Sequence, residues 1–435
     1  MKKNARFRKK VLMTAIASTF LVGGTTASAN MLSELRAEMQ AMQEKIAQLE
    51  EKQKASEKSG GDSIKVKWEP APKFTSADGR FQMNIRGRLM LDYNNLDDDD
   101  DTIDVDATET RRARIGIQGK MWDDFKYKYE ADFANNDVSI KDALIAYTGG
   151  PVDVTVGQFS TAAFMEEYES SRFTTFIERA GFSGAFGADR AVGIQLSDSI
   201  GNFVWNASYN RGNISDDDDN EMKQLYASGH FFGVNDNSHY HIGASVRDRS
   251  AGDTDFRYRQ RPQNAHLSPT RFVNTGRIAD GDRYYGLELG GSVGSLGLKA
   301  EYGQLNADLV AGGDADFSGG YVEASYWLTG ESVSASYDGG DGGIGRPKVK
   351  APFGDQGHGA WQIATRYETL DLNDGAVTGG EQDAWTIGLN WWLNKYTRIS
   401  ANFSRTEVDN GPVAENGPDG ENEIDSFALR AQVDW

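Results

Sequence analysis

The sequence contains no cysteine, which excludes a disulfide framework and thiolate metal sites. After residue 29 it has no apolar run approaching the roughly 18 residues that a membrane-spanning helix requires. Its five histidines are scattered, "GFSGA" around Ser183 lacks the glycine spacing of a nucleophile elbow, and no phosphate-cradling glycine loop precedes a helix. We therefore expect no enzyme activity, no cofactor and no metal ion.

Basic residues are in the minority, with 46 Lys and Arg against 65 Asp and Glu and a formal net charge of −19. This balance gives no reason to expect a nucleic-acid partner. Within the acidic chain, "DFRYRQRP" at 255–262 places Arg257, Arg259 and Arg261 at every second position. Alternate side chains of an extended backbone point the same way, so three positive charges would share one face.

The first 29 residues form a targeting segment. "MKKNARFRKK" carries six basic residues and no acidic one, an apolar run of 12 residues follows, and "ASA" at 27–29 is a small-residue cleavage site. The pattern predicts a secretory signal peptide at 1–29, and a basic start with a short apolar core suits bacterial export. Its removal takes away six positive charges and changes the net charge from −19 to −25.

Residues 30–57 predict a short α-helical coiled coil, because apolar residues recur at alternating spacings of three and four. The positions are Leu32, Leu35, Met39, Met42, Ile46 and Leu49. A helix this short is marginal in water, so we expect self-association; the alternative is a helix lying on another surface. We interpret residues 58–79 as a linker.

From residue 80 to residue 435 the apolar periodicity is two. In "FKYKYEADF" at 125–133, aromatic and small residues alternate with two lysines and two carboxylates. The candidate strands have the length of about 9–12 residues that a tilted membrane span needs. Many apolar faces begin or end in an aromatic residue. The opposite faces carry full charges, which a water-filled lumen accommodates and a packed sandwich core does not. The pattern predicts an all-β transmembrane barrel.

We count 16 strands in this barrel. They are predicted at 80–93, 110–121, 125–134, 139–148, 152–159, 190–198, 202–210, 222–233, 238–248, 283–293, 296–305, 318–328, 359–370, 383–393, 396–407 and 423–435. A weaker segment at 332–337 would make the number odd, so we assign it to a long periplasmic connection at 329–358. The fold class is therefore a 16-stranded antiparallel transmembrane β-barrel with a short N-terminal coiled coil.

Several segments together resemble a known family. They are "GRLMLDY", "TRRARIGIQG", "YKYEADFANN", "KDALIAYTG", "VTVGQF", "SSRFTTFIERA", "FRYRQRP" and "GAWQIATRYETLDLND", in family order between residue 80 and residue 435. They are similar to the phosphate-selective porins O and P of Gram-negative outer membranes. The resemblance implies a homotrimer of 16-stranded barrels, a third loop folded into each pore, and an arginine-lined path for phosphate or polyphosphate.

The first group of candidate residues belongs to the expected constriction. The resemblance places Arg88, Arg111, Arg112 and Arg179 at the pore centre, with Asp132 opposite. Alternation puts Arg86 and Arg114 on the same faces as Arg88 and Arg112, and it would direct Arg111 outward unless the strand end turns it in. The 30-residue stretch 160–189 is too long for an ordinary connection and contains Arg172 and Arg179. The alternative is that loop carboxylates such as Glu178 pair with these arginines and only hold the loop.

The second group is the arginine row. Arg257, Arg259 and Arg261 lie in the long segment 249–282, which the strand parity places outside the cell. If this loop dips into the vestibule, its arginines collect anions, since guanidinium groups bind oxyanions through parallel hydrogen bonds. The alternative is a solvated loop edge whose arginines pair with neighbouring aspartates.

One departure affects the expected substrate. The family commonly has Lys after "GQF", and this chain has Ser160. A hydroxyl donates a hydrogen bond but brings no charge. Two alternatives to a phosphate channel therefore stand: a porin of the same fold with another or broader substrate range, and an envelope tether or adhesin that uses the coiled coil.

Partners outside the pore follow from the surface. We interpret the acidic runs at 97–101 and 216–219 as solvated external loop charge that divalent ions can bridge to lipopolysaccharide in the outer-membrane lipid. The runs lack the spacing of a calcium-binding loop. The coiled coil would reach into the periplasm towards peptidoglycan or a protein partner.

Overall fold

The computed structural model describes residues 37, 39–48, 51, 64–99, 103–161, 163–187, 190–216, 219–354, 356–412, 416 and 419–435. The chain divides into two units, residues 1–63 and 64–435. In the first unit, every described residue is helical and exposed, so a helix is present where the heptad predicts one. Self-association of that helix stays a prediction, and the predicted signal peptide lies outside the described residues.

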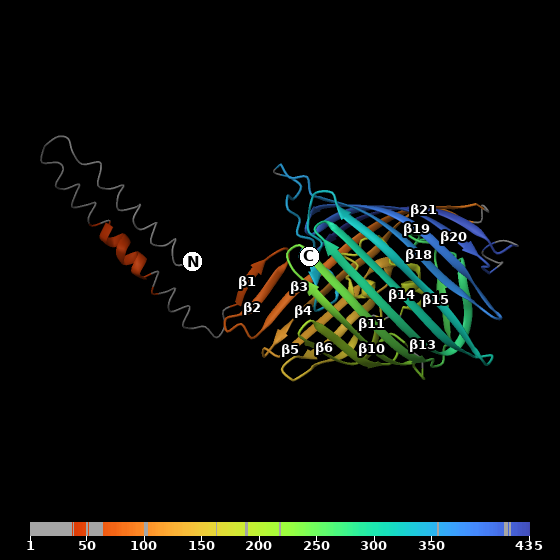
Figure 1. The fold of residues 1–435 in the computed structure, drawn as a ribbon. Helices are drawn as coiled ribbons and strands as arrows, with labels where there is room; N and C mark the ends of the chain where they lie inside the picture. The colour runs from red at the N-terminus through yellow and green to blue at the C-terminus, as the bar shows by residue number, and fades with distance from the viewer. Residues whose placement is uncertain are drawn as a thin grey trace. The chain divides into compact units, whose positions relative to one another are not determined.

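The second unit is built from strands (Figure 1). Their bounds are β1 Ile64–Trp68, β2 Pro72–Ser76, β3 Gln82–Asp98, β4 Asp104–Met121, β5 Phe125–Asp132, β6 Ser139–Tyr147, β7 Asp153–Ser160, β8 Arg190–Ile200, β9 Phe203–Asn210, β10 Lys223–Val234, β11 Ser238–Ser250, β12 Phe256–Gln260, β13 Val273–Val293, β14 Leu296–Leu309, β15 Asp314–Trp327, β16 Tyr337–Asp338, β17 Gly343–Ile344, β18 Ala360–Asp374, β19 Val377–Asn394, β20 Thr397–Asp409 and β21 Asn422–Asp434. Between the strands, the described residues include the short α-helices α3 Met165–Tyr168 and α4 Gly181–Phe186 and the 3-10 turns η1 Ala134–Asn136 and η2 Ser334–Ser336.

Sixteen of the described strands form a closed antiparallel wall, which confirms the predicted number: β3–β11, β13–β15 and β18–β21. The wall closes where β21 pairs with β3, from Ile424 opposite Asp98 to Asp434 opposite Arg88. Closure removes the open sheet edges that a membrane cannot tolerate. We call the end that holds Gln82 and Trp435 the terminal end and the opposite end the loop end.

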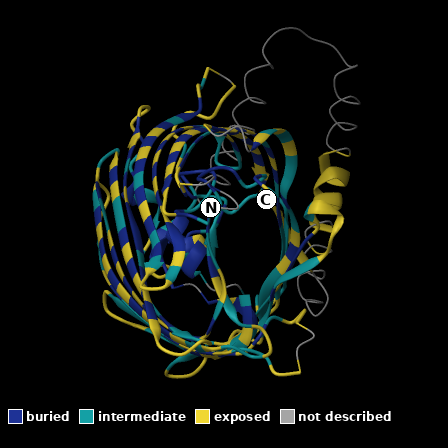
Figure 2. Cartoon of the chain, turned by 90° about the vertical axis from the view of Figure 1, so that its right-hand side faces the viewer, coloured by how far each residue is buried: buried dark blue, intermediate teal, exposed yellow. Residues whose placement is uncertain are grey.

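Exposure alternates along the wall, as the period of two predicts. Figure 2 shows bands of buried and exposed residues repeating along the strands, with buried helical turns inside the ring. On β21, Phe427, Leu429 and Val433 are exposed on the outer face, whereas Arg430 and Asp434 are buried inside. The outer face is apolar and the inner face is polar, which is the pattern of a barrel surrounded by lipid. No helix in the described part of the chain is both long and apolar enough to cross a membrane.

Two sequence assignments are wrong in part. Residues 64–76, inside the assigned linker, form the β1–β2 hairpin, which pairs with the start of β3 because its own residues also alternate. The segment 249–282 is not a plain loop: β12 pairs with the extension of β13, which begins at Val273 rather than at residue 283. The polar sequence of that extension concealed it, since a strand that projects into water needs no apolar face.

Candidate functional site

The third connection at the loop end, residues 161–189, folds into the barrel; we call its described part the inward loop. The backbone N–H groups of Met165 and Glu166 donate hydrogen bonds to the carboxylate of Glu301 on β14 at 2.7 and 2.9 Å. The N–H of Gly181 donates to Glu368 on β18 at 2.7 Å. Carboxylates of the far wall therefore satisfy loop backbone groups that would otherwise be buried without partners.

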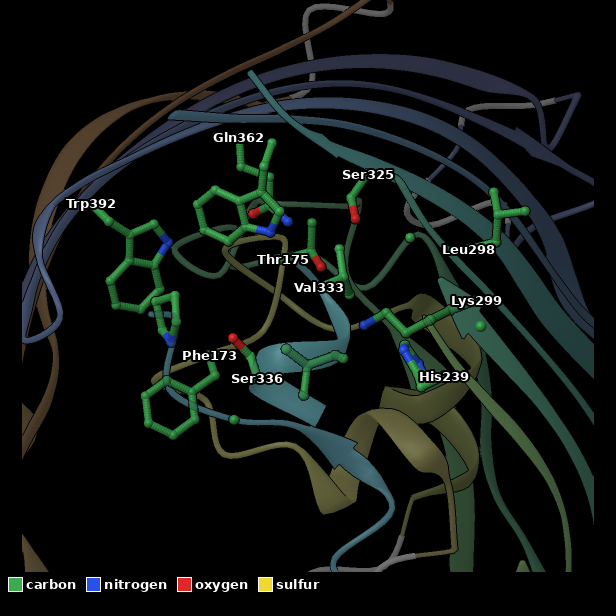
Figure 3. A pocket seen from close by; sticks show the side chains of 16 residues that line it. Phe173, Thr175, His239, Leu298, Lys299, Ser325, Val333, Ser336, Gln362 and Trp392 are labelled. Carbon is green, nitrogen blue, oxygen red and sulfur yellow. The ribbon is translucent and has the colours of Figure 1, made fainter. Parts of the chain in front are cut away.

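The connection 328–359 enters the barrel from the terminal end and meets the inward loop. The N–H of Ile344 donates to the Glu169 carboxylate at 3.0 Å, and the Arg346 guanidinium lies 4.5–5.1 Å from the rings of Tyr396 and Phe173. Figure 3 shows the small cavity of about 30 Å³ where the two segments come together beside Lys299. The connection 328–359 therefore occupies part of the lumen at this end.

A larger cavity of about 540 Å³ lies between the inward loop and the β12 region. We call it the arginine cavity, because its lining includes eight arginines from four parts of the chain: Arg111, Arg112, Arg179, Arg249, Arg257, Arg259, Arg261 and Arg271. The acidic side chains among its lining residues are Glu167 and Glu178. The cavity is therefore strongly positive inside a chain that is negative as a whole.

The β12 strand explains how the arginine row faces this cavity. Tyr258, between Arg257 and Arg259, is fully buried and donates its hydroxyl hydrogen to Asp282 on β13 at 2.9 Å. Because neighbouring side chains of a strand point in opposite directions, Arg257 and Arg259 face the other way. Arg261 follows the strand and donates to the Ser268 carbonyl at 2.7 Å. The pairing of β12 is irregular at Phe256/Arg257 and at Arg257/Arg259, and all three arginines line the cavity.

The row carries little compensating negative charge. Among the described residues, Arg257, Arg259, Arg261 and Arg271 form no ion pair with a carboxylate, and Nη1 of Arg271 is buried without a hydrogen-bond partner. Burial, followed by the charges of the other three arginines, lowers the pKa of Arg271 to about 10. Uncompensated positive charge of this kind attracts anions.

Arg111 also faces the cavity, although alternation would direct it outward. The β3–β4 register shifts between Met90 and Leu91, so Arg111 is an extra residue on β4 and its side chain turns inward. It donates to both carboxylate oxygens of Glu178, from Nε at 2.9 Å and from Nη2 at 3.0 Å. Arg112 and Arg179 form no ion pair within the described part of the chain; Arg179 donates to the carbonyls of Glu166 and Glu169.

The other predicted constriction residues lie outside the arginine cavity. Arg88 donates to Ser171 of the inward loop at 2.8 Å and to Glu130 at 3.4 Å, and Arg86 pairs with the same glutamate at 3.2 Å. Arg114 pairs with Asp132 at 2.7 Å. The expectation that Asp132 lies opposite the arginines is wrong, since β4 and β5 are neighbours in one wall.

Arg172 and Ser160 are also separate from the arginine cavity. Arg172 pairs with Asp434 at 3.5 Å near the terminal end. Ser160 lines a second polar cavity of about 740 Å³, which shares only Glu167 with the first. Ser160 therefore does not line the arginine cavity.

Sequence reasoning missed Arg249, which lies one position beyond the predicted strand 238–248; its alternation with Arg247 was the available signal. It also missed the anchoring role of Glu301 and Glu368, because nothing in a single strand shows what faces it across a barrel. In the part of the chain that the structure describes, no three His, Asp or Glu side chains are grouped to hold a metal ion.

Comparison with known sequences identifies relatives over most of the chain. The family described as "Phosphate-selective porin O and P" matches residues 83–435. An uncharacterised protein of Caulobacter vibrioides is 30% identical over 387 residues, which cover 85% of this chain and 77% of the relative. Porin O of Pseudomonas aeruginosa is 26% identical over 416 residues, covering 86% of this chain and 92% of that protein.

Solved structures show the same fold at low identity. OmpT of Vibrio cholerae aligns with a TM-score of 0.52 and 13% identity, covering 82% of this chain and 98% of that one. The channel DcaP of Acinetobacter baumannii aligns with a TM-score of 0.52 and 14% identity over 83% and 99% of the two chains. An anion-selective porin from Comamonas acidovorans aligns with a TM-score of 0.51 and 12% identity over 81% and 99%. These likenesses concern the barrel architecture.

Proposed function

This chain belongs to the phosphate-selective porin O and P family and is a channel of the bacterial outer membrane, and from that premise we propose that it carries anions, with phosphate as the preferred one. The single observation that carries the proposal is the arginine cavity, in which eight arginines face two glutamates. Selectivity in a channel arises when fixed charges and donors replace part of the hydration of an ion.

Phosphate suits this lining better than a simple halide. The planar guanidinium group can donate two parallel hydrogen bonds to an oxyanion, and several arginines in succession offer moderate sites rather than one deep trap. Arg257, Arg259 and Arg261 would collect the ion, and Arg112 and Arg179 would receive it next to the inward loop. Conduction requires this balance between entry and release.

We propose a homotrimer as the assembled state. OmpT of Vibrio cholerae, which shares the fold, has been solved in a trimer form. Contacts of the coiled coil with peptidoglycan, and of the acidic loops with lipopolysaccharide, remain proposals from the sequence. Deletion of residues 30–57 should leave the conductance unchanged if the coiled coil serves only as a tether.

Planar-bilayer recording of the purified full-length protein tests the channel proposal. The reversal potential under a potassium chloride gradient should show a preference for chloride, and added inorganic phosphate should block the chloride current by occupying the same path. A pore that prefers potassium would overturn the proposal.

A second candidate is a porin of this fold with another substrate, which the position of Ser160 favours. The serine lines the second cavity, away from the arginine cavity, and brings no charge there. Ser160→Lys should lower the phosphate concentration needed for block if the missing charge has weakened phosphate binding. An unchanged concentration would show that Ser160 does not determine the substrate.

A further inference from the structure

We propose that Glu178 is a built-in counter-anion of the arginine cavity: its carboxylate occupies guanidinium groups that a permeating oxyanion also uses, and thereby shortens the stay of that ion. The inference rests on the proposed anion-carrying function and adds a residue that sets how tightly the ion is held. It concerns the rate of release rather than the choice between anions and cations.

The contacts of Glu178 are those of a bound oxyanion. Arg111 donates to both carboxylate oxygens at 2.9 and 3.0 Å, and Nη2 of Arg430 donates to Oε1 at 3.0 Å. Two parallel bonds from one guanidinium group are also the arrangement that binds phosphate. The Glu178 side chain is 20% exposed and lines the cavity, so an ion in the cavity can reach the same donors.

The carboxylate is charged under all ordinary conditions. Burial by itself would raise the pKa of Glu178, but Arg111, Arg430 and Arg112 outweigh burial and lower that pKa well below its usual value. The Glu178 charge also acts on the arginine row, because it opposes the fall in the pKa of Arg261 that burial and Arg111 cause. Glu178 therefore cancels positive charge at several arginines at once.

The side chain of Glu178 is not needed to hold the inward loop. Its own carbonyl accepts a hydrogen bond from Arg366 at 3.1 Å, and the carbonyls on either side accept from the wall and from the β12 region. Arg430 donates to Ile177 at 2.7 Å, and Gln263 donates to Arg179 at 2.9 Å. The backbone is fixed by these bonds, so the carboxylate is free to exchange its partners.

Exchange of one oxyanion for another explains how release stays fast. A phosphate attracted by Arg112 and Arg179 can displace the carboxylate from Arg111, and the carboxylate can return when phosphate moves on. Arg111 keeps an anionic partner throughout, which avoids the cost of leaving a buried charge unpaired. Without the carboxylate, phosphate would have to leave a set of arginines with nothing to replace it.

The test compares the wild-type channel with Glu178→Gln in the full-length protein, using inorganic phosphate to block the chloride current in planar bilayers. Glutamine keeps the size of the side chain and removes the charge. The concentration for half-maximal block should fall about tenfold, which corresponds to roughly 1.4 kcal/mol of tighter binding, and single blocking events should last longer. Glu178→Asp, which keeps the charge, should stay near the wild type. Glu178→Ala also removes the charge, should tighten the block in the same direction, and replaces the glutamine variant if that one does not fold.

Glu221→Gln is the matched control, because Glu221 pairs with Arg211 at 3.0 Å in another loop and does not line the cavity. It should leave the block unchanged. If phosphate blocks the wild type and blocks Glu178→Gln equally or more weakly, the inference is overturned while the anion channel stands. A variant that only raises the chloride conductance would show that Glu178 holds the loop, and would also overturn it. No block of the wild type by phosphate would contradict the proposed substrate, whereas block confined to the variant would still support the role of Glu178.

Discussion

Arg430 on β21 donates two hydrogen bonds to the carboxylate of Asp92 on β3, from Nε at 2.7 Å and from Nη2 at 2.6 Å, and the two residues are directly opposite in the register. Both side chains are almost completely buried in the lumen. The pair spans the seam at which the last strand of the barrel meets the first. The same arginine connects this seam to the arginine cavity, because Arg430 also donates a hydrogen bond to Glu178, which lines the cavity.

Asp92→Ala should therefore destabilise the folded barrel by about 3–5 kcal/mol, because removal of one partner leaves a buried charge without its main counter-ion. Urea unfolding in lipid vesicles measures the loss. Asp425→Ala is the control, since Asp425 also lies on β21 but its pair with Arg405 is exposed, and about 1 kcal/mol or less is expected. Equal losses for the two variants would contradict this account of the seam.

The positive electrostatic field of the arginine row should determine the selectivity of the channel for anions over cations. Arg259→Ala combined with Arg271→Ala removes two positive charges from the cavity, so the permeability ratio of chloride to potassium should fall several-fold at low salt. The difference should shrink above roughly 1 M salt, where charges are screened within about 3 Å. Arg283→Ala, which removes an exposed arginine paired with Asp248 and outside the cavity, should not change the reversal potential. If the loss of selectivity is the same at all salt concentrations, long-range electrostatic attraction by these arginines is not its cause.

Glu301 should control how firmly the inward loop is held. Glu301→Ala leaves the N–H groups of Met165 and Glu166 without their acceptor, at a cost of about 1–3 kcal/mol for each group. Single-channel recordings should show larger current fluctuations and a higher mean conductance. Glu381→Ala, at the outer loop-end edge of β19, should show the same current fluctuations and mean conductance as the wild type. A variant with unchanged current noise would show that other contacts suffice.

Gly87 should be essential for barrel closure. A Cβ atom at this position would lie 2.3 Å from Cζ2 of Trp435 and 2.8 Å from the backbone oxygen of Arg114, so Gly87→Ala forces the terminal residue away from β3. The fraction of protein that migrates as folded barrel in unheated gels should fall. Gly150→Ala, whose nearest contact is an ordinary 3.4 Å, should fold like the wild type. Normal folding of both variants would show that close contact between Gly87 and Trp435 is not required for barrel closure.

The barrel and its 16 strands could be predicted from the sequence because alternation with period two is a local property of each strand. A strand with lipid on one side and water on the other must alternate, whatever lies across the lumen. The same reasoning failed for the start of β13, where residues 273–282 project beyond the apolar belt and need no such pattern. It also failed for Arg111, because a register shift between two strands is visible only when both strands are in place.

By itself the sequence determined the strand pattern and the apolar outer face, since each depends on neighbours within a few residues. Only the tertiary structure decided which arginines face the cavity together and which are taken up by carboxylates. Arg88 binds Glu130 and Ser171, whereas Arg112 forms no ion pair with any residue that the structure describes, although both come from neighbouring charged faces. The physical reason is that charge interactions depend on distance in space. Barrel closure brings Arg430 to Asp92, 338 positions away, and the inward loop brings Glu178 to Arg430, 252 positions away.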